Sequence, residues 1–328
     1  MQILQNINVD WVGKRKLYLV ISATLLLVSL ASLFFVDRGG PRLMRGLPLG
    51  VDFRGGTLVY VKFNQTPDEE RIRQAVQQAG INDARIQRYG PASENQVIIS
   101  VEQASRDEEA LTRGREQIVS VLSQNFGTGF EVRNVEVVGP QVGEQLQQAA
   151  LLAVAFASAG MLVYLWFRFE LIYGAASIAA VLHDVIITLG IFSLLNVEIS
   201  LTVIAAMLTL IGYSMNDTIV IFDRVRENLK LLRRERLPEL VNISINQTLS
   251  RTVLTSGLTF LTVLSLYLFG GEVLHGFSLA LVIGILLGTY STIAVAAPLL
   301  VVYQEWRGTR GRTAPVPAAA NRRDKVRA

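Results

Sequence analysis

The sequence predicts an α-helical membrane bundle of six transmembrane helices, with an inserted α+β domain of ferredoxin-like order outside the membrane. Three observations predict this class. Hydrophobic residues make up 51% of the 328 residues and charged residues only 18%, whereas soluble domains are about a quarter charged. Six apolar runs reach the roughly 20 residues that a helix needs to cross the hydrocarbon. The segment between the first two runs instead alternates between apolar and polar positions, as strands do.

The six predicted spans are Leu17–Val36, Leu146–Phe167, Leu171–Leu195, Leu201–Phe222, Thr252–Phe269 and Phe277–Tyr303. The first span has a second interpretation as a cleaved signal peptide, because Lys14, Arg15 and Lys16 precede it. Its apolar run continues to Val36, which is longer than the apolar region of a usual signal peptide. We therefore interpret it as a membrane anchor.

Clusters of basic residues predict the orientation, because Lys and Arg concentrate in cytoplasmic segments. The predicted parts are a cytoplasmic N-terminus at 1–16, a first helix at 17–36, an external domain with membrane-proximal linkers at 37–144, helices two to six at 145–303 with a basic cytoplasmic loop at about 224–250, and a basic, disordered cytoplasmic tail at 304–328. We expect the tail to be solvated, and contact of its basic run with anionic lipid or a partner is the alternative.

The inserted domain is predicted to contain four strands and two helices. The strands are Leu58–Phe63, Ala84–Tyr89, Val97–Val101 and Phe130–Val138, and the helices are Pro67–Ala79 and Arg106–Gln124. Gly90–Pro91 marks a turn between the two middle strands. The order β-α-β-β-α-β is the split βαβ, ferredoxin-like arrangement. This fold supports many activities, so it indicates none by itself.

A glycine-rich stretch, Leu-Gly-Val-Asp-Phe-Arg-Gly-Gly-Thr, precedes the first strand. Three glycines in seven residues indicate special backbone angles or close packing. No Gly-Lys-Ser/Thr follows and the stretch leads into a strand, so it is not a phosphate loop. By itself the pattern is that of a turn joining the membrane to the domain, and a coupling role is the alternative. Its candidate residues are Gly50, Asp52, Phe53, Arg54, Gly55, Gly56 and Thr57.

Ionisable residues inside the predicted spans are candidates for function, because a charge in hydrocarbon is costly. Asp217 follows Asn216 within the fourth span and is the strongest candidate. His183 and Asp184 lie near the middle of the third span; we interpret His183 as a packing residue, with a proton relay as the alternative. Arg251 opens the fifth span. It is either a flanking charge that reaches the interface or a partner for a buried carboxylate.

Gly284 and Gly288 form a G-x-x-x-G pattern in the sixth span, which permits close helix contact within the chain or with a partner. The chain has no cysteine, which excludes disulfides and thiolate chemistry. No nucleotide-binding, metalloprotease or hydrolase motif is apparent. We therefore expect no enzyme activity, no metal and no cofactor. The basic residues flank apolar spans, so we expect no nucleic-acid partner either.

Together these features resemble the SecF family, the smaller half of the bacterial SecD–SecF accessory complex of the protein-export translocon. The resemblance covers nearly the whole chain apart from the tail. It is carried by Gly50–Thr57, Leu182–Val185, Ile211–Thr218 continuing through Asp223–Asn228, Gln247–Thr252, Thr255–Gly257, Leu268–Gly271 and Gly276–Ser278. Several long motifs in this order make the resemblance specific.

The resemblance implies a relative of the resistance-nodulation-division (RND) transporters in the bacterial cytoplasmic membrane. Such chains pair with SecD in a twelve-helix bundle and use the proton-motive force, or sodium in some members, to help preproteins finish crossing. The implied partners are SecD, the SecYEG translocon, unfolded preprotein and membrane lipid, with YajC as a further candidate.

The family's ion-path residues are the Asp of its Tyr-Ser-x-Asn-Asp motif and the Arg that opens span five, which correspond to Asp217 and Arg251 here. We place Asn216, Asp184 and His183 on the same path, and expect protonation of Asp217 to weaken its pairing with Arg251. Two alternatives remain. One is an RND-type exporter subunit for lipids or small molecules, and the other is a membrane scaffold without ion coupling.

Overall fold

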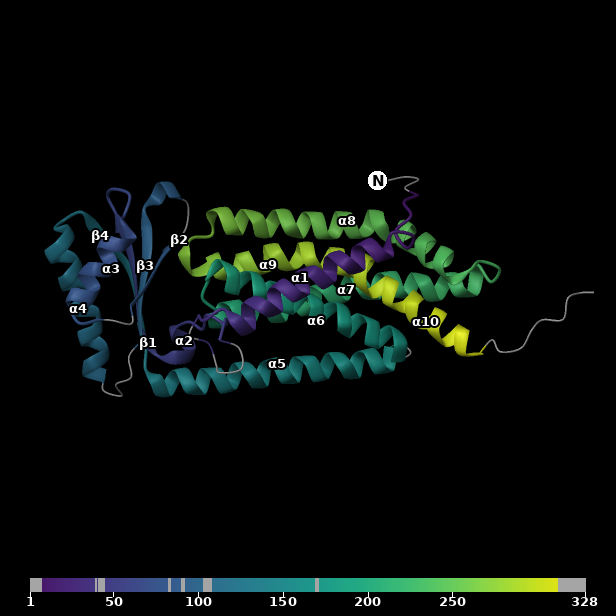
Figure 1. The fold of residues 1–328 in the computed structure, drawn as a ribbon, viewed down its shortest axis with the longest axis horizontal. Helices are drawn as coiled ribbons and strands as arrows, with labels where there is room; N and C mark the ends of the chain where they lie inside the picture. The colour runs from purple at the N-terminus through teal and green to yellow at the C-terminus, as the bar shows by residue number, and fades with distance from the viewer. Residues whose placement is uncertain are drawn as a thin grey trace, which may run out of the picture.

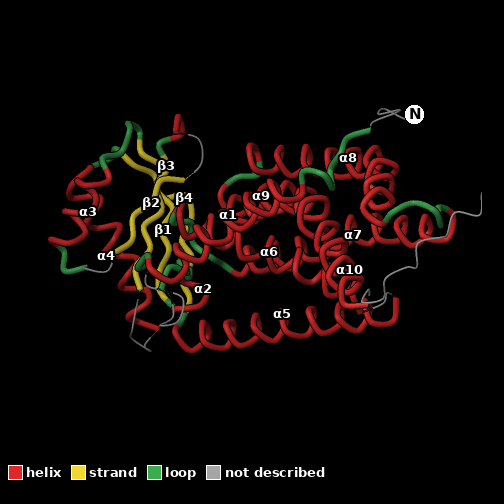
Figure 2. Tube along the Cα trace, turned by 45° about the vertical axis from the view of Figure 1, so that its right-hand side comes forward, coloured by secondary structure: helices red, strands yellow, loops and turns green. Residues whose placement is uncertain are grey.

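The computed structural model describes residues 8–38, 40, 45–81, 84–89, 92–102, 108–168 and 171–311. A long helical bundle carries the α+β domain at one end (Figures 1 and 2). The predicted Gly90–Pro91 turn, residues 1–7, and residues 312–328 of the predicted tail lie outside the described residues.

Six helices among the described residues are long and apolar enough to cross a membrane, as the sequence predicted. They are α1 (Arg15–Phe35), α5 (Pro140–Arg168), α6 (Leu171–Leu195), α7 (Leu201–Leu231), α8 (Leu237–Phe269) and a last span built from α9 (Glu272–Ser291), the π-helical turn η2 (Thr292–Ala296) and α10 (Ala297–Gly311). The most buried spans are α6, α7 and the last one, whereas α1, α5 and α8 have far fewer buried residues. The bundle is therefore built around α6, α7 and α9.

The helices extend beyond the predicted spans at the end of the bundle opposite the α+β domain. Most of the predicted loop at about 224–250 is helical, because α7 continues to Leu231 and α8 already begins at Leu237. Buried polar contacts hold the two extensions together, since Asn228 donates to the Ser244 hydroxyl at 2.8 Å. The prediction of disorder is wrong for residues 304–311, where α10 continues to Gly311.

The α+β domain has the predicted order of elements. Its strands are β1 (Gly56–Phe63), β2 (Ala84–Tyr89), β3 (Gln96–Glu102) and β4 (Phe130–Val138); its helices are α3 (Glu69–Gln78) and α4 (Glu108–Phe126), with short helical turns α2 (Val51–Arg54) and η1 (Ala92–Glu94). The sheet order is β2-β3-β1-β4, and every neighbouring pair is antiparallel. The first helix begins because Asp68 caps it, accepting from the amides of Glu70 and Arg71.

The sheet of the α+β domain separates a small core from the bundle. α3 and α4 lie on the side of the sheet away from the bundle (Figure 1). Val59, Ile72, Ile99 and Ile118 are among the fully buried residues between sheet and helices. The opposite side of the sheet, with Leu58 and Tyr60, belongs to a separate small cluster near α2. This second side therefore forms the junction with the bundle.

Candidate functional site

Asp217 lies inside the α7 span and is 3% exposed. Its Oδ2 accepts a hydrogen bond from the Ser256 hydroxyl of α8, at 2.8 Å. None of the ion pairs between described residues includes Asp217. A buried carboxylate with a single side-chain hydrogen-bond donor is poorly compensated, which makes it a candidate for binding an ion or a proton.

Arg251 does not pair with Asp217 within the described part of the chain, so the predicted ion pair is absent from this structure. The Arg251 side chain is exposed. Five residues separate it from Ser256, which turns the helix by about 500° and leaves the two side chains about 140° apart around α8. Asn216 is also exposed, because it lies about 100° around α7 from Asp217. Both therefore lie on the outer surface of this bundle.

Asp184 of α6 is 1% exposed and contacts three donors. Its Oδ2 accepts from the hydroxyls of Ser214 on α7, at 2.6 Å, and Ser291 on α9, at 2.7 Å. Its Oδ1 lies 3.0 Å from Nδ1 of His183. The His183 ring also stacks on Tyr290, and its Nε2 is buried without a partner among the described residues. Asp184 thus ties the three central helices together.

The two carboxylates are linked through α7. Ser214 and Asp217 are three residues apart, so they lie one turn from each other on the same face. The π-helical turn η2 begins directly after Ser291, and such turns recur at functional sites. The sequence did not predict the contacts of Ser214, Ser256 and Ser291 with these carboxylates. Many serines in these helices bond only to their own helix, and which of them contacts a carboxylate depends on the packing of the helices.

Gly284 and Gly288 bring α9 close to α7 within this chain. A Cβ atom at Gly284 would lie 2.4 Å from Cδ1 of Leu210, and one at Gly288 would lie 3.0 Å from Cβ of Ser214. Larger residues would push the helices apart. The glycines therefore allow the approach that places Ser291 and Ser214 on the same Asp184 oxygen.

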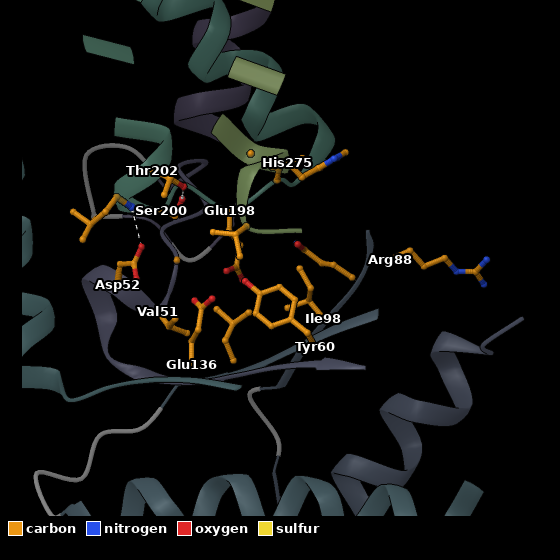
Figure 3. A pocket seen from close by; sticks show the side chains of 17 residues that line it. Val51, Asp52, Tyr60, Arg88, Ile98, Glu136, Glu198, Ser200, Thr202 and His275 are labelled. Carbon is orange, nitrogen blue, oxygen red and sulfur yellow. Dashed lines mark hydrogen bonds between the residues drawn. The ribbon is translucent and has the colours of Figure 1, made fainter. Parts of the chain in front are cut away.

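The glycine-rich stretch is bound to the start of α7. The Gly50 amide donates to the Ile199 carbonyl at 2.9 Å, and the Ile199 amide donates to the Pro48 carbonyl at 2.7 Å. The Asp52 carboxylate accepts from the Leu201 amide at 2.8 Å, as the dashed line in Figure 3 shows. This carboxylate thus satisfies one of the free amides in the first turn of the helix that also carries Asp217.

The remaining residues of the stretch fix its shape and anchor it. Phe53 is 7% exposed and belongs to a hydrophobic cluster of the bundle that includes Ile199 and Val203. Gly55 and Gly56 have φ values of +76° and +146°, which side chains rarely allow. The other two positions are Thr57, which is fully buried, and Arg54, which is half-buried. The stretch is therefore attached to the bundle by a buried side chain and by its hydrogen bonds to the start of α7.

A cavity of about 340 Å³ lies between the sheet and the bundle, beside this junction. Three carboxylates line it: Asp52, Glu136 of β4 and Glu198 of the α6–α7 loop. Burial, and then the nearby charge of Asp52, raise the pKa of Glu136, while a hydrogen bond from Tyr60 opposes the shift. The sequence did not indicate a role for Glu136, because the alternation of residues along a strand does not reveal what its polar side chains contact.

Among the described residues no group of three or more His, Asp or Glu side chains is arranged to hold a metal ion. The candidate site consists instead of carboxylates at two levels. Two lie inside the spans, and three lie at the junction with the α+β domain.

Six apolar helices with buried carboxylates and a single α+β domain define a multi-pass membrane protein with ionisable groups inside its spans. Two family models match this chain: the SecD/SecF GG motif over residues 43–67, and the C-terminal part of the protein export membrane proteins SecD/SecF over residues 118–306. The chain belongs to the SecD/SecF family, on its SecF side.

The relatives extend this match along the chain. The protein translocase subunit SecF of Koribacter versatilis is 49% identical, over all of this chain and 99% of the relative. The subunit of the same name from Calditerrivibrio nitroreducens is 44% identical over 92% of this chain and 95% of its own length. The first match covers the predicted tail as well.

Solved structures of SecDF share the fold. The crystal structure of the translocon-associated membrane protein SecDF from Thermus thermophilus superimposes with a TM-score of 0.79 at 36% identity, covering 93% of this chain. A SecDF structure in a super-membrane-facing form gives a TM-score of 0.64 at 35% identity over 94% of this chain. In both cases the match covers 40% of the SecDF chain. This chain therefore corresponds to about two fifths of a SecDF molecule.

Proposed function

We propose that this chain is the SecF subunit of a SecD–SecF complex that uses the proton-motive force, or sodium, to help preproteins finish crossing the bacterial cytoplasmic membrane. The family match supports the translocase assignment. The observation that carries the ion coupling is Asp217, a buried carboxylate inside a span with one hydroxyl partner. An exporter for lipids or small molecules is less well supported, because SecF relatives match nearly the whole chain.

The orientation follows from the basic residues. Figure 1 shows the start of α1 and the connection between α7 and α8 at the end of the bundle away from the α+β domain. Lys14 and Lys16 belong to the first of these segments, and Arg226 and Arg233 to the second. The short loops at the domain end, 196–200 and 270–271, contain no Lys or Arg. Positive charge favours the cytoplasm. The α+β domain is therefore external, and its strand order supports the ferredoxin-like class.

The outer surface of α7 and α8 supports pairing with a second bundle. Small or polar residues are exposed along α7 at Ala205, Thr209, Gly212 and Asn216, each three or four positions from the last. Arg251, Thr255 and Thr262 are exposed in the same way along α8. Small and hydroxyl residues suit helix contacts better than lipid contacts. SecD is the partner we assign to this surface, and SecYEG, YajC and the unfolded preprotein are further partners of the assembled complex.

The proposed cycle starts when Asp217 gains or loses a proton. The change alters its hydrogen bond with Ser256, and α8 shifts against α7. Arg251 then acts from the surface toward SecD rather than as a fixed ion-pair partner within the chain. Leu201 and Asp217 are sixteen residues apart on one helix, or about 24 Å. α7 therefore carries the movement to Asp52, and the external domain pulls or holds the emerging preprotein.

The test uses inverted membrane vesicles that contain this chain with its SecD partner. Completion of a trapped preprotein is measured after ATP is exhausted, with and without an imposed proton gradient. We expect wild type to respond to the gradient and Asp217→Asn to lose the response. Asp223→Asn is the matched control, because Asp223 lies on the same helix but its side chain is 57% exposed and pairs with Arg168.

Two outcomes would contradict the proposal. Equal completion in wild type and Asp217→Asn would return Asp217 to a structural role and favour a scaffold without ion coupling. Equal loss in Asp223→Asn would trace the effect to α7 stability rather than to the buried acid. Assembly with SecD is measured in parallel by co-purification, which we expect all three proteins to retain.

A further inference from the structure

Glu136 is a carboxylic acid placed where the α+β domain meets the bundle. It is half-buried on β4, and its carboxyl group points into the cavity between Asp52 and Tyr60 (Figure 3). β4 leads directly into α5, so Glu136 also lies on the segment that carries the chain back into the membrane. A change in the charge of Glu136 therefore affects both segments that connect the domain to the bundle. One is the segment with Asp52 before β1, and the other is the link from β4 to α5.

Glu136 has hydrogen-bond donors, since Asn134 donates to its Oε1 at 3.2 Å and Tyr60 also bonds its carboxyl group, but no cation among the described residues that line the cavity faces it. Arg54 of α2 is half-buried and does not line the cavity. Among the described residues that line the cavity, the titratable or charged groups are Asp52, Tyr60, Arg88, Glu198 and His275. Arg88 points away from Glu136 in Figure 3 and pairs with Glu69 at 2.7 Å. Glu198 accepts from Ser100 at 3.0 Å and lies 3.6 Å from Arg85, which offsets its negative charge. His275 lies beyond Glu198, at the end of the bundle.

A hydrogen bond to the start of α7 holds the Asp52 side chain close to Glu136. The Asp52 carboxylate accepts from the Leu201 amide at the start of α7, where a helix favours negative charge. It therefore cannot withdraw without giving up that hydrogen bond. Two like charges facing a partly closed cavity repel each other. The repulsion is relieved if Glu136 binds a proton or if the domain moves away from the bundle.

We propose that Glu136 is a proton-operated clasp between the α+β domain and the bundle. When Glu136 is protonated, the α+β domain stays docked against the start of α7. Without the proton, Glu136 repels Asp52 and loosens the junction. The clasp concerns docking alone and does not depend on ion coupling at Asp217, so either proposal can fail without the other.

The direction of the pH dependence follows from the raised pKa of Glu136 in the docked junction. When the domain separates, water returns to the carboxyl group and the pKa falls toward its ordinary value of 4.5. Docking therefore binds protons. It is complete below the ordinary pKa and weakens as the pH rises through the raised one. Glu136 thus links the position of the domain to the acidity of the compartment it faces.

The absence of cysteines makes the test direct. Spin labels are placed on Gln65→Cys in the domain and Phe269→Cys at the domain end of α8, both exposed positions. The full chain is reconstituted in nanodiscs of phosphatidylethanolamine and phosphatidylglycerol. Distances between the labels are then measured by electron–electron resonance from pH 4 to pH 9. We expect one narrow distance at low pH and a broader distribution at high pH.

Variants identify the responsible group. Glu136→Gln mimics the protonated acid and should keep the narrow distance at every pH. Asp52→Asn retains an oxygen for the Leu201 amide but removes the charge, so the transition should move to lower pH. Glu131→Gln is the control, because Glu131 is on the same strand with a side chain 62% exposed. The proposal is overturned if Glu136→Gln titrates as wild type does, or if the wild-type distance does not change with pH.

Discussion

Phe53 is the side chain by which the glycine-rich stretch enters the bundle core, and its removal should uncouple the two parts of the molecule. It is 7% exposed and shares a cluster with Ile199 and Val203. Truncating a buried Phe to Ala costs about 3–5 kcal/mol. At 1.4 kcal/mol for each factor of ten, this corresponds to a roughly 150- to 4,000-fold increase in local opening of the junction. Phe53→Leu, which keeps most of the volume, should cost much less.

Hydrogen exchange of the full chain in detergent or nanodiscs measures this opening. The amides of Ile199 and Leu201 donate to Pro48 and to the Asp52 carboxylate in the intact junction. We expect both amides to lose protection in Phe53→Ala, while the amides in the middle of α6 stay protected. Unchanged exchange at Ile199 and Leu201 would refute the reasoning, because the hydrogen bonds would then hold the junction without the aromatic anchor. Loss of protection throughout the bundle would also refute it, since the effect would then be global.

Two further predictions concern packing. Gly288→Val should destabilise the bundle by about 1–3 kcal/mol, because even a Cβ there would lie 3.0 Å from Cβ of Ser214. Gly160→Val is the control, because nothing lies within 4 Å of a Cβ at that position. Equal melting temperatures for the two variants would contradict this prediction. Asn242 and Asn246 bind the backbone of the segment before α1, with contacts of 2.8 and 2.9 Å. Replacing both with Ala should speed hydrogen exchange in that segment, at about 0.5–1.5 kcal/mol for each lost hydrogen bond, and an unaltered rate would show that other contacts hold it.

The sequence predicted the elements well because each is set by a local requirement. A helix must be apolar for about 20 residues to cross hydrocarbon, whatever it packs against. The predicted bounds of α6, Leu171–Leu195, match the structure for this reason. The strands β2 and β4 also match, since alternation depends only on a strand having two different faces. The requirement for apolar residues applies only within the membrane. The sequence therefore did not predict the helical extensions of α7 and α8 beyond it.

The partners inside the bundle were beyond the reach of sequence patterns. Ser256 and Asp217 are 39 residues apart, and Ser291 and Asp184 are 107 residues apart. Nothing local distinguishes these serines from the many that bond only to their own helix. The predicted pairing of Asp217 with Arg251 shows the same limit. Arg251 is five residues from Ser256 on α8, and the rotation of that helix decides which of its side chains faces Asp217.

The two carboxylates inside the spans differ in their number of donors, and this difference argues for different roles. Asp184 has three donors, from its own helix, α7 and α9. These contacts compensate the burial of the Asp184 side chain, which holds the central helices in place. Asp217 has one side-chain donor, on α8, which is among the more exposed spans. A change of charge at Asp217 therefore disturbs one contact to a peripheral helix and leaves the Asp184 contacts intact. We expect α8 to shift relative to α6, α7 and α9, which move together as one unit, so a buried acid can drive motion without unfolding the bundle that surrounds it.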